Sequence, residues 1–204
     1  MEQRSPEWFA ARLGRVTASK IADVIAKTKT GYGASRDDYM TNLILERMTG
    51  APTESISNQF MEWGTQQEPF ARAEYEKVKE VLVDEVGIIY HPTIEMTGAS
   101  PDGLVGDDGL VEIKCPSSKT HMATILSQTI AGKYFAQMQW QLCCTKRSWC
   151  DFVSFDPRMP EGLKLYIKRV ERDDKYISML EEEVIKFLQE LEVKLNQLMK
   201  VQNV

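Results

Sequence analysis

The sequence predicts one domain of the α/β or α+β class, with a central mixed β-sheet flanked by helices. Three observations lead to this prediction. Segments with helical periodicity fill most of the first 80 residues. Clusters of β-branched and aromatic residues follow within 81–116 and 148–172, separated by a helical stretch. A helical pattern closes the chain, and a length of 204 residues suits a single domain, 1–204, with its own core.

Helical segments are expected to begin at Ser5-Pro6 and to cover 19–27, 36–50 and 60–80. Thr17 or Ser19 can cap the second segment, and Gly50 is typical of the end of the third. Pro69 implies a start or a kink within the fourth. Residues 27–33, which contain two glycines and two lysines, are expected to form a flexible loop.

The remaining elements are expected in this order: strands within 81–92, 95–106 and 110–116, helices on either side of Gly132, strands within 148–157 and 164–172, and an amphipathic helix at about 173–201. The last helix carries apolar residues at helical spacing: Ile177, Leu180, Val184, Phe187, Leu188, Leu191, Leu195 and Leu198. Such a face packs on its own domain or on another subunit, and packing on its own domain is the favoured interpretation.

The composition is that of a soluble globular protein, with 43% apolar and 27% charged residues. No apolar run approaches the roughly 18 residues that a membrane helix needs, and the first residues contain no apolar signal core. We therefore expect a cytoplasmic protein that does not bind membranes. The cysteines match neither a zinc pattern nor iron–sulfur spacing, so free and mostly buried thiols are expected at Cys115, Cys143, Cys144 and Cys150.

The net charge of −5 argues weakly against a nucleic-acid partner. Its distribution weakens that objection. Residues 1–50 hold eight Lys/Arg and six Asp/Glu, a balance of +2, whereas residues 171–204 hold five and eight, a balance of −3. A basic N-terminal face can therefore meet phosphates while the acidic end points away.

The stretch from Gly98 to Pro116 combines two short strands with an unusual set of charges. Asp102 follows a proline at a strand end, and Glu112 projects from the facing strand. Because side chains alternate along a strand, Lys114 lies on the same face as Glu112. Two carboxylates form a hard oxygen site that suits Mg²⁺ or Mn²⁺. An ammonium beside them can orient an attacking water, so the set indicates phosphodiester hydrolysis.

The alternative is a surface hairpin with an incidental salt bridge, and for an isolated Glu-x-Lys that alternative is favoured. The "SPDG" element before the strand and the apolar residues around its charges change the balance. Two charges on a central strand are costly to bury without a partner ion or substrate.

Several sequence blocks carry a resemblance to a known family. They are "WFAARLGRVTAS", "EWGTQQEPFARAEYE", "GASPDGLV", "LVEIKCP", "YFAQMQWQL" and "FDPRMPEGLKLYIKRVERDDKYI". Together they span Trp8 to about Ile177. The chain resembles the phage lambda exonuclease family, also called the YqaJ-like viral recombinase family, within the PD-(D/E)xK nuclease superfamily. The resemblance implies a restriction-endonuclease-like core.

The resemblance also implies roles for site residues. Asp102 and Glu112 are expected to bind metal beside the backbone carbonyl of Ile113, with Lys114 at the attacking water. Glu68 is expected to reach a second ion directly or through water, and Gln137 to touch the active site. Without the family, Glu68 would be a solvated helix acid and Gln137 a surface amide.

A terminal phosphate is expected to be bound by Arg12, Ser19 and Ser100. Arg12 in isolation would be a surface salt bridge. The DNA-contact candidates are Lys27, Lys29, Met61 and Tyr134. A solvated loop is an equal alternative for the two lysines, and a core position is the commoner outcome for a methionine.

The function implied is that of a 5′→3′ exonuclease that degrades one strand of linear duplex DNA to mononucleotides and leaves 3′ overhangs for recombination by strand annealing. It would use Mg²⁺, which Mn²⁺ can replace, with two ions in each site. The implied partners are double-stranded DNA ends and a phage single-strand annealing protein in the host cytoplasm, and the implied assembly is a homotrimeric ring. An endonuclease, or a non-catalytic DNA-binding module on the same fold, remains the alternative.

Overall fold

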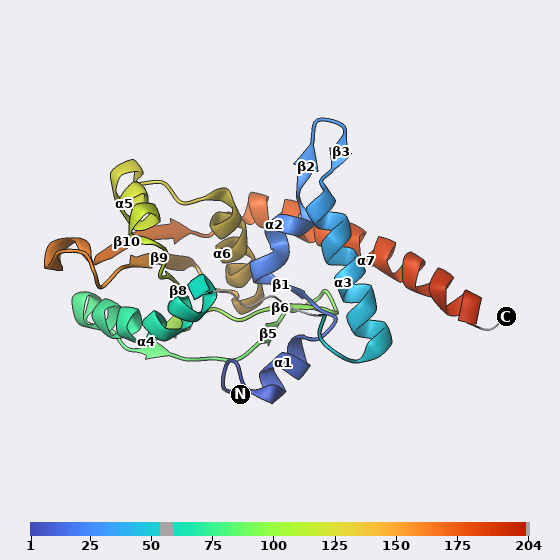
Figure 1. The fold of residues 1–204 in the computed structure, drawn as a ribbon, viewed down its shortest axis with the longest axis horizontal. Helices are drawn as coiled ribbons and strands as arrows, with labels where there is room; N and C mark the ends of the chain where they lie inside the picture. The colour runs from blue at the N-terminus through green and yellow to red at the C-terminus, as the bar shows by residue number, and fades with distance from the viewer. Residues whose placement is uncertain (54–58, 203–204) are drawn as a thin grey trace.

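The computed structural model describes residues 1–53 and 59–202 (Figure 1). Its described helices are α1 (Pro6–Arg12), α2 (Ile21–Val24), α3 (Ala34–Thr49), α4 (Gln59–Lys79), α5 (Ser118–Ser127), α6 (Gly132–Thr145) and α7 (Asp174–Gln202), with 3₁₀ turns η1 (Ala18–Lys20) and η2 (Glu161–Leu163). Ser5 caps α1 by accepting a hydrogen bond from the backbone N–H of Trp8 at 3.2 Å. Gly50 ends α3 in the left-handed conformation, with φ of 67°. None of the described helices combines the length and apolarity needed to cross a bilayer.

A five-stranded mixed sheet forms the centre of the protein, in the order β10-β9-β8-β7-β4. Its strands are β4 (Val83–Asp84), β7 (Gly103–Val105), β8 (Gly109–Lys114), β9 (Trp149–Phe155) and β10 (Leu165–Glu171). The β8–β9 pair is parallel and the other pairs are antiparallel. The predicted class, an α/β arrangement with a central mixed sheet, is therefore confirmed.

Two smaller sheets lie beside the central one. The first contains β1 (Val16–Thr17), β6 (Thr97–Ala99) and β5 (Ile89–Tyr90), in the order β1-β6-β5. The second is a hairpin of β2 (Lys27–Thr28) and β3 (Gly31–Tyr32), which projects from the body of the protein (Figure 1).

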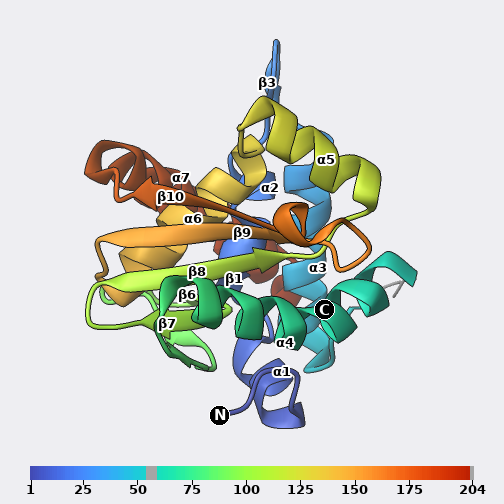
Figure 2. The same ribbon diagram turned by 90° about the vertical axis from the view of Figure 1, so that its left-hand side faces the viewer.

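Side-chain alternation along β8 assigns its two faces to two different helices. Val111 and Ile113 pack with Ala71 and Tyr75 of α4. Leu110, on the opposite face, packs with residues of α6. Figure 2 shows α4 in front of the sheet and α6 behind it. Because residues two apart share a face, Glu112 points toward α6 with Leu110.

A further hydrophobic cluster packs the N-terminal helices against α6 and α7. Ile21, Met40, Trp140 and Phe187 are among its fully buried members. Four buried residues of α7 belong to this cluster, so the predicted packing of the terminal helix on its own domain is confirmed for that part: Leu180, Val184, Phe187 and Leu191. Leu198, near the end of α7, is exposed. The four cysteines are free thiols, and three of them are buried.

Three expectations differ, wholly or in part, from the structure. Pro69 lies inside α4 rather than at a helix start. Since proline has no N–H, the helix loses one internal hydrogen bond there, and the packing of Ala71 and Tyr75 on the sheet offsets that loss. The expected helix 19–27 is replaced by η1 and a short α2. Residues 27–33 form the β2–β3 hairpin instead of a flexible loop, with Gly31, the first residue of β3, at φ of 150°.

Candidate active site

The β7–β8 hairpin brings Asp102 and Glu112 to one end of the central sheet. Asp102 directly precedes β7, and its Oδ2 accepts a hydrogen bond from the backbone N–H of Ile113 at 2.6 Å. Gly103 follows it and pairs with Val111. A Cβ at position 103 would lie 2.0 Å from the Val83 side chain, so only glycine allows strand β4 to approach this closely.

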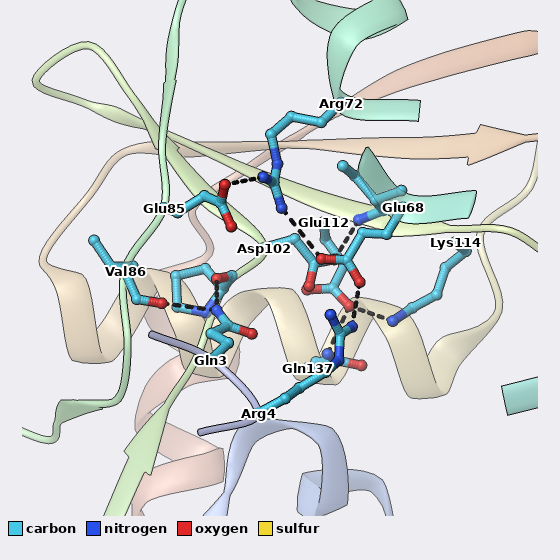
Figure 3. A network of polar contacts seen from close by, with 12 residues as sticks. Gln3, Arg4, Glu68, Arg72, Glu85, Val86, Asp102, Glu112, Lys114 and Gln137 are labelled. Atoms are coloured by element: carbon cyan, nitrogen blue, oxygen red, sulfur yellow. Dashed lines mark hydrogen bonds and ion pairs between the residues drawn. The ribbon is translucent and has the colours of Figure 1, made fainter. Parts of the chain in front are cut away.

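The Glu112 carboxylate is buried and held by three side chains, of which Figure 3 shows Gln137 and Lys114. Gln137 Nε2 donates to Oε1 at 2.7 Å, and Gln141 Nε2 donates to Oε2 at 2.6 Å. Lys114 Nζ also bonds to Oε1 and forms an ion pair with it. Gln137 and Gln141 lie one turn apart on α6, so a single helix face supplies both amides. The orientation of this carboxylate is therefore fixed from two directions.

The charges in this cluster shift one another's pKa values. Burial, followed by the charge of Glu112, raises the pKa of Asp102 well above its usual value. Burial alone would lower the pKa of Lys114, but the nearby carboxylates of Glu112 and Asp102 outweigh it and raise that pKa. Lys114 is consequently a charged hydrogen-bond donor in this arrangement.

Glu68 joins the cluster from α4 and is almost fully buried. Its carboxylate lies between two arginines, Arg4 and Arg72 (Figure 3). Arg72 Nη2 is 3.3 Å from Glu68 Oε1, and the same arginine pairs with Glu85. Glu68 is thus an ion-paired acid at the cluster rather than the solvated helix acid of the alternative interpretation.

Arg12 and Ser100 form a second polar group beside the acids. Arg12 Nη1 donates to Ser100 Oγ at 3.0 Å, and Trp8 Nε1 donates to the same oxygen at 3.0 Å. The Arg12 guanidinium lies 4.2 Å from the centre of the Trp8 ring. Burial lowers the pKa of Arg12, but an arginine remains charged. This group presents a partly desolvated positive charge suited to a phosphate.

One cavity of about 700 Å³ contains both groups. Its lining includes these predicted site residues: Arg12, Ser19, Glu68, Ser100, Asp102, Glu112, Ile113, Lys114, Tyr134 and Gln137. Tyr134 lies beneath Lys114, whose Nζ is 5.2 Å from the ring centre. Ser100 and Asp102 are separated only by Pro101, so the Arg12–Ser100 pair and the acids are adjacent.

Two other DNA-contact candidates, Lys27 and Lys29, are not among the residues that line this cavity. Lys27 is on the projecting hairpin, where its Nζ forms an ion pair with Glu183 at 2.7 Å. Lys29 is exposed in the turn of that hairpin. Met61 falls within α4, but its side chain is outside the described part of the chain.

Three residues of the site were missed from the sequence. Trp8 lies one helical turn before Arg12, and that spacing is a signal that could have been used. Gln141 repeats the position of Gln137 one turn later on the same helix. Arg4 has no such local signal, because it meets Glu68 across 64 positions of sequence.

The donor set fits a hard divalent cation. Asp102 and Glu112 offer carboxylate oxygens, Ile113 offers its carbonyl, and Glu68 lines the same cavity. Burial is the main reason that the pKa of Asp102 is raised, and the neighbouring charge of Glu112 raises it further. A bound Mg²⁺ or Mn²⁺ would offset the repulsion between the two carboxylates, and all the donors are oxygens, which these ions prefer.

The family comparison agrees with this geometry. The model of the YqaJ-like viral recombinase domain matches residues 7–148, more than half of the chain. The chain belongs to the YqaJ-like viral recombinase family. The resemblance carried by the sequence blocks is confirmed.

Two solved structures are similar to this family member over nearly their whole length. One is described as LHK-Exo in complex with dAMP, with 51% identity, a TM-score of 0.92 and 98% of each chain covered. The other is described as an alkaline exonuclease (LHK-Exo) from Laribacter hongkongensis, with 50% identity, a TM-score of 0.91 and the same coverage.

A more distant relative is an uncharacterized protein of Acanthamoeba polyphaga mimivirus. It is 28% identical over 166 residues, which cover 74% of this chain. The match spans only 29% of the mimivirus protein, so the two proteins share a domain within a much longer viral chain.

Proposed function

We propose that this protein is a divalent-metal-dependent 5′→3′ exonuclease acting on the ends of double-stranded DNA. The observation that carries the proposal is the adjacency of two groups in one cavity: the Arg12–Ser100 pair, suited to a terminal phosphate, and the acids Asp102 and Glu112. The similarity to an alkaline exonuclease over 98% of both chains supports it, as does the dAMP complex of that relative.

The chemistry is hydrolysis of the first phosphodiester linkage. A water oxygen forms a bond to phosphorus while the bond from phosphorus to the O3′ of the terminal nucleotide breaks, and the leaving O3′ takes up a proton. The products are a 5′-mononucleotide and a new 5′-phosphate on the shortened strand. That new phosphate has the same chemistry as the one bound before, so the Arg12–Ser100 group can receive it for the next cycle.

Different residues of the chain have different roles in this reaction. Arg12, Ser19 and Ser100 bind the terminal phosphate and set the register of the strand. Lys114 donates a hydrogen bond that orients the attacking water, while Gln137 and Gln141 hold Glu112 in place. Asp102, Glu112 and the Ile113 carbonyl would hold Mg²⁺ or Mn²⁺, and Glu68 would serve a second ion; when bound, the metal would supply Lewis-acid polarisation and neutralise developing charge.

The biological setting that we propose is the one that the family resemblance implies. The 3′ overhangs would feed a single-strand annealing protein of a phage in the cytoplasm of its bacterial host. A homotrimeric ring around the duplex would keep the enzyme on one strand. Both remain part of the proposal.

A digestion time course on linear duplex tests the proposal. The duplex is labelled separately at each 5′ and 3′ end and incubated with Mg²⁺, with Mn²⁺ and with EDTA. We expect mononucleotides from the 5′ ends only, and none in EDTA. A closed circular duplex should stay intact, and nicking or linearisation of that circle would favour an endonuclease. Undigested linear duplex with both ions would favour a non-catalytic DNA-binding module.

Lys114→Ala tests the mechanism. We expect it to remove cleavage while the protein keeps its fold and its affinity for duplex ends, because Lys114 lies at the reacting atoms and not in the phosphate pocket. Circular dichroism and a binding assay in EDTA are the controls. Wild-type digestion by this variant would contradict the role given to Lys114. Equal rates on 5′-phosphorylated and 5′-hydroxyl ends would contradict the role of Arg12.

A further inference from the structure

The first residues of the chain are fastened to the active-site hairpin. Gln3 Nε2 donates to the backbone carbonyl of Val86 at 2.8 Å and to that of Pro101 at 2.7 Å (Figure 3). Pro101 directly precedes Asp102. The segment before α1 is therefore held against the loop that supplies one of the expected metal ligands.

This anchoring places Arg4 at the acids. Its backbone has φ of 67°, in the left-handed region that residues other than glycine seldom adopt. Its Nη2 bonds to Glu68, and both Gln3 and Arg4 line the cavity that contains Asp102 and Glu112. The Arg4 side chain is 44% exposed and belongs to the lining of the cavity, so a ligand in the cavity can reach it.

Glu68 does not need Arg4 for charge compensation. Arg72 contacts the other oxygen of the same carboxylate and approaches from the opposite side (Figure 3). The Arg72 side chain is only 13% exposed and is not among the residues that line the cavity. The two arginines thus share one acid, but only Arg4 is reachable by a ligand in the cavity.

We propose that Arg4 is a substrate-binding residue that contacts the phosphate of the first phosphodiester linkage. A guanidinium carries five N–H donors in a fixed fork, and the contact with Glu68 uses only Nη2. The remaining donors can bind a non-bridging phosphate oxygen next to the acids. Arg12 then serves the terminal phosphate and Arg4 serves the next one along the strand. This inference rests on the proposed function, because it assumes a DNA strand in this cavity.

The competing explanation is that Arg4 acts only through Glu68. Arg72 provides the matched control, since Arg72→Gln also removes a cation from Glu68 but leaves the cavity lining unchanged. If Arg4 touched only the acid, the two substitutions would affect DNA binding in the same way.

The test measures binding in EDTA, where no metal-dependent cleavage takes place. The probe is a short 5′-phosphorylated duplex, compared with the same duplex carrying an uncharged methylphosphonate at its first linkage. Both are titrated at one fixed salt concentration, because phosphate contacts weaken with salt. The proteins are the wild type, Arg4→Gln, Arg4→Ala and Arg72→Gln, each checked for folding by its thermal melting curve.

We expect the uncharged linkage to weaken wild-type binding by about 10-fold or more, as for a hydrogen bond between charged groups. In both Arg4 variants the difference between the two duplexes should fall to about twofold, whereas Arg72→Gln should keep the wild-type difference. An unchanged difference in the Arg4 variants, or an equal loss in Arg72→Gln, would overturn the proposal. Digestion of unmodified duplex by the wild type tests the exonuclease function separately, so the two failures are distinguishable.

Discussion

Replacing Gln141 with leucine should separate catalysis from stability. Gln141 is fully buried on α6, and its Nε2 donates to Glu112 at 2.6 Å. Its Oε1 is buried without a hydrogen-bond partner. The substitution removes one hydrogen bond to a charged group, which lowers the free energy of unfolding by about 1.5–3 kcal/mol. It also removes one unpaired buried acceptor, which raises that free energy by about 1–3 kcal/mol. The two contributions nearly cancel, leaving about 1 kcal/mol or less and a shift in Tm within about 4 °C.

The expected effect on kcat has no such compensating contribution. Glu112 loses one of the two amides that fix its orientation, and only Gln137 and Lys114 still hold it. If most of that hydrogen-bond energy is realised at the transition state, kcat should fall by about 10-fold or more. Steady-state digestion of 5′-phosphorylated duplex measures this, and differential scanning calorimetry measures the Tm.

Gln139 is the matched control, two residues away on the same helix. It is also fully buried, but it faces away from Glu112, because two residues correspond to about 200° of helix rotation. Its Nε2 donates to the carbonyl of Glu171 at 2.8 Å, and its Oε1 accepts from the N–H of Asp173 at 2.9 Å. Gln139→Leu leaves the partly buried carbonyl of Glu171 and N–H of Asp173 without this partner, and should lower the free energy of unfolding by about 1–3 kcal/mol.

The two variants should therefore show opposite phenotypes. Gln139→Leu should melt roughly 2–12 °C lower and keep kcat within about twofold of the wild type. Gln141→Leu should melt near the wild type and digest DNA slowly. Wild-type kcat in Gln141→Leu, or an equal loss of kcat in both variants, would refute the assignment of Gln141 to the active site.

Two further predictions concern the N-terminal half of the chain. Trp8→Phe removes the N–H that bonds to Ser100 but keeps an aromatic ring beneath Arg12. The preference for 5′-phosphorylated over 5′-hydroxyl duplex, measured by binding in EDTA, should therefore fall about 2- to 10-fold, and an unchanged preference would exclude Trp8 from the phosphate pocket. Burial raises the pKa of Tyr39 to about 12, so the folded state retains a proton that the unfolded chain releases near pH 10. The contribution of Tyr39 to the free energy of unfolding is then fully present below pH 10, and about 3 kcal/mol of it should be lost between pH 10 and 12, as measured by urea unfolding. Tyr39→Phe should lack this loss. If the free energy of unfolding of Tyr39→Phe fell with pH as steeply as that of the wild type, the argument would be contradicted.

The sequence was most informative where the site is local. Asp102, Glu112 and Lys114 lie within 13 residues of one hairpin. Strand alternation predicted that Glu112 and Lys114 share a face, and the facing strands of the hairpin predicted that Asp102 approaches Glu112. The central mixed sheet followed from the order of the elements in the same way. Local patterns do not specify how distant segments pack, so nothing in the sequence alone predicted that Arg4 would reach Glu68. For the same reason Pro69 lies inside α4 rather than at a helix start, since the burial of Ala71 and Tyr75 against the sheet overrides the local preference of proline.

A second cluster of ligand-type side chains shows why residue type alone does not define a metal site. His91, Cys143 and Glu181 bring one nitrogen, one sulfur and one oxygen within 4.8 Å of one another. His91 Nδ1 accepts hydrogen bonds from the backbone N–H groups of Thr93 and Ile94, at 3.3 and 3.0 Å.

The neutral histidine proton must then be on Nε2, which faces Glu181 at 3.2 Å and Cys143 at 3.1 Å. A ligating histidine shows the opposite arrangement, with its free nitrogen donating and its lone pair directed at the ion. This cluster is therefore a hydrogen-bonded contact that joins the β5–β6 connection to α6 and α7. At the acid cluster, by contrast, the hydrogen-bond donors around Asp102 and Glu112 are amides, an ammonium and one backbone N–H, all the candidate ligand atoms are oxygens, and the residues that carry them line one cavity.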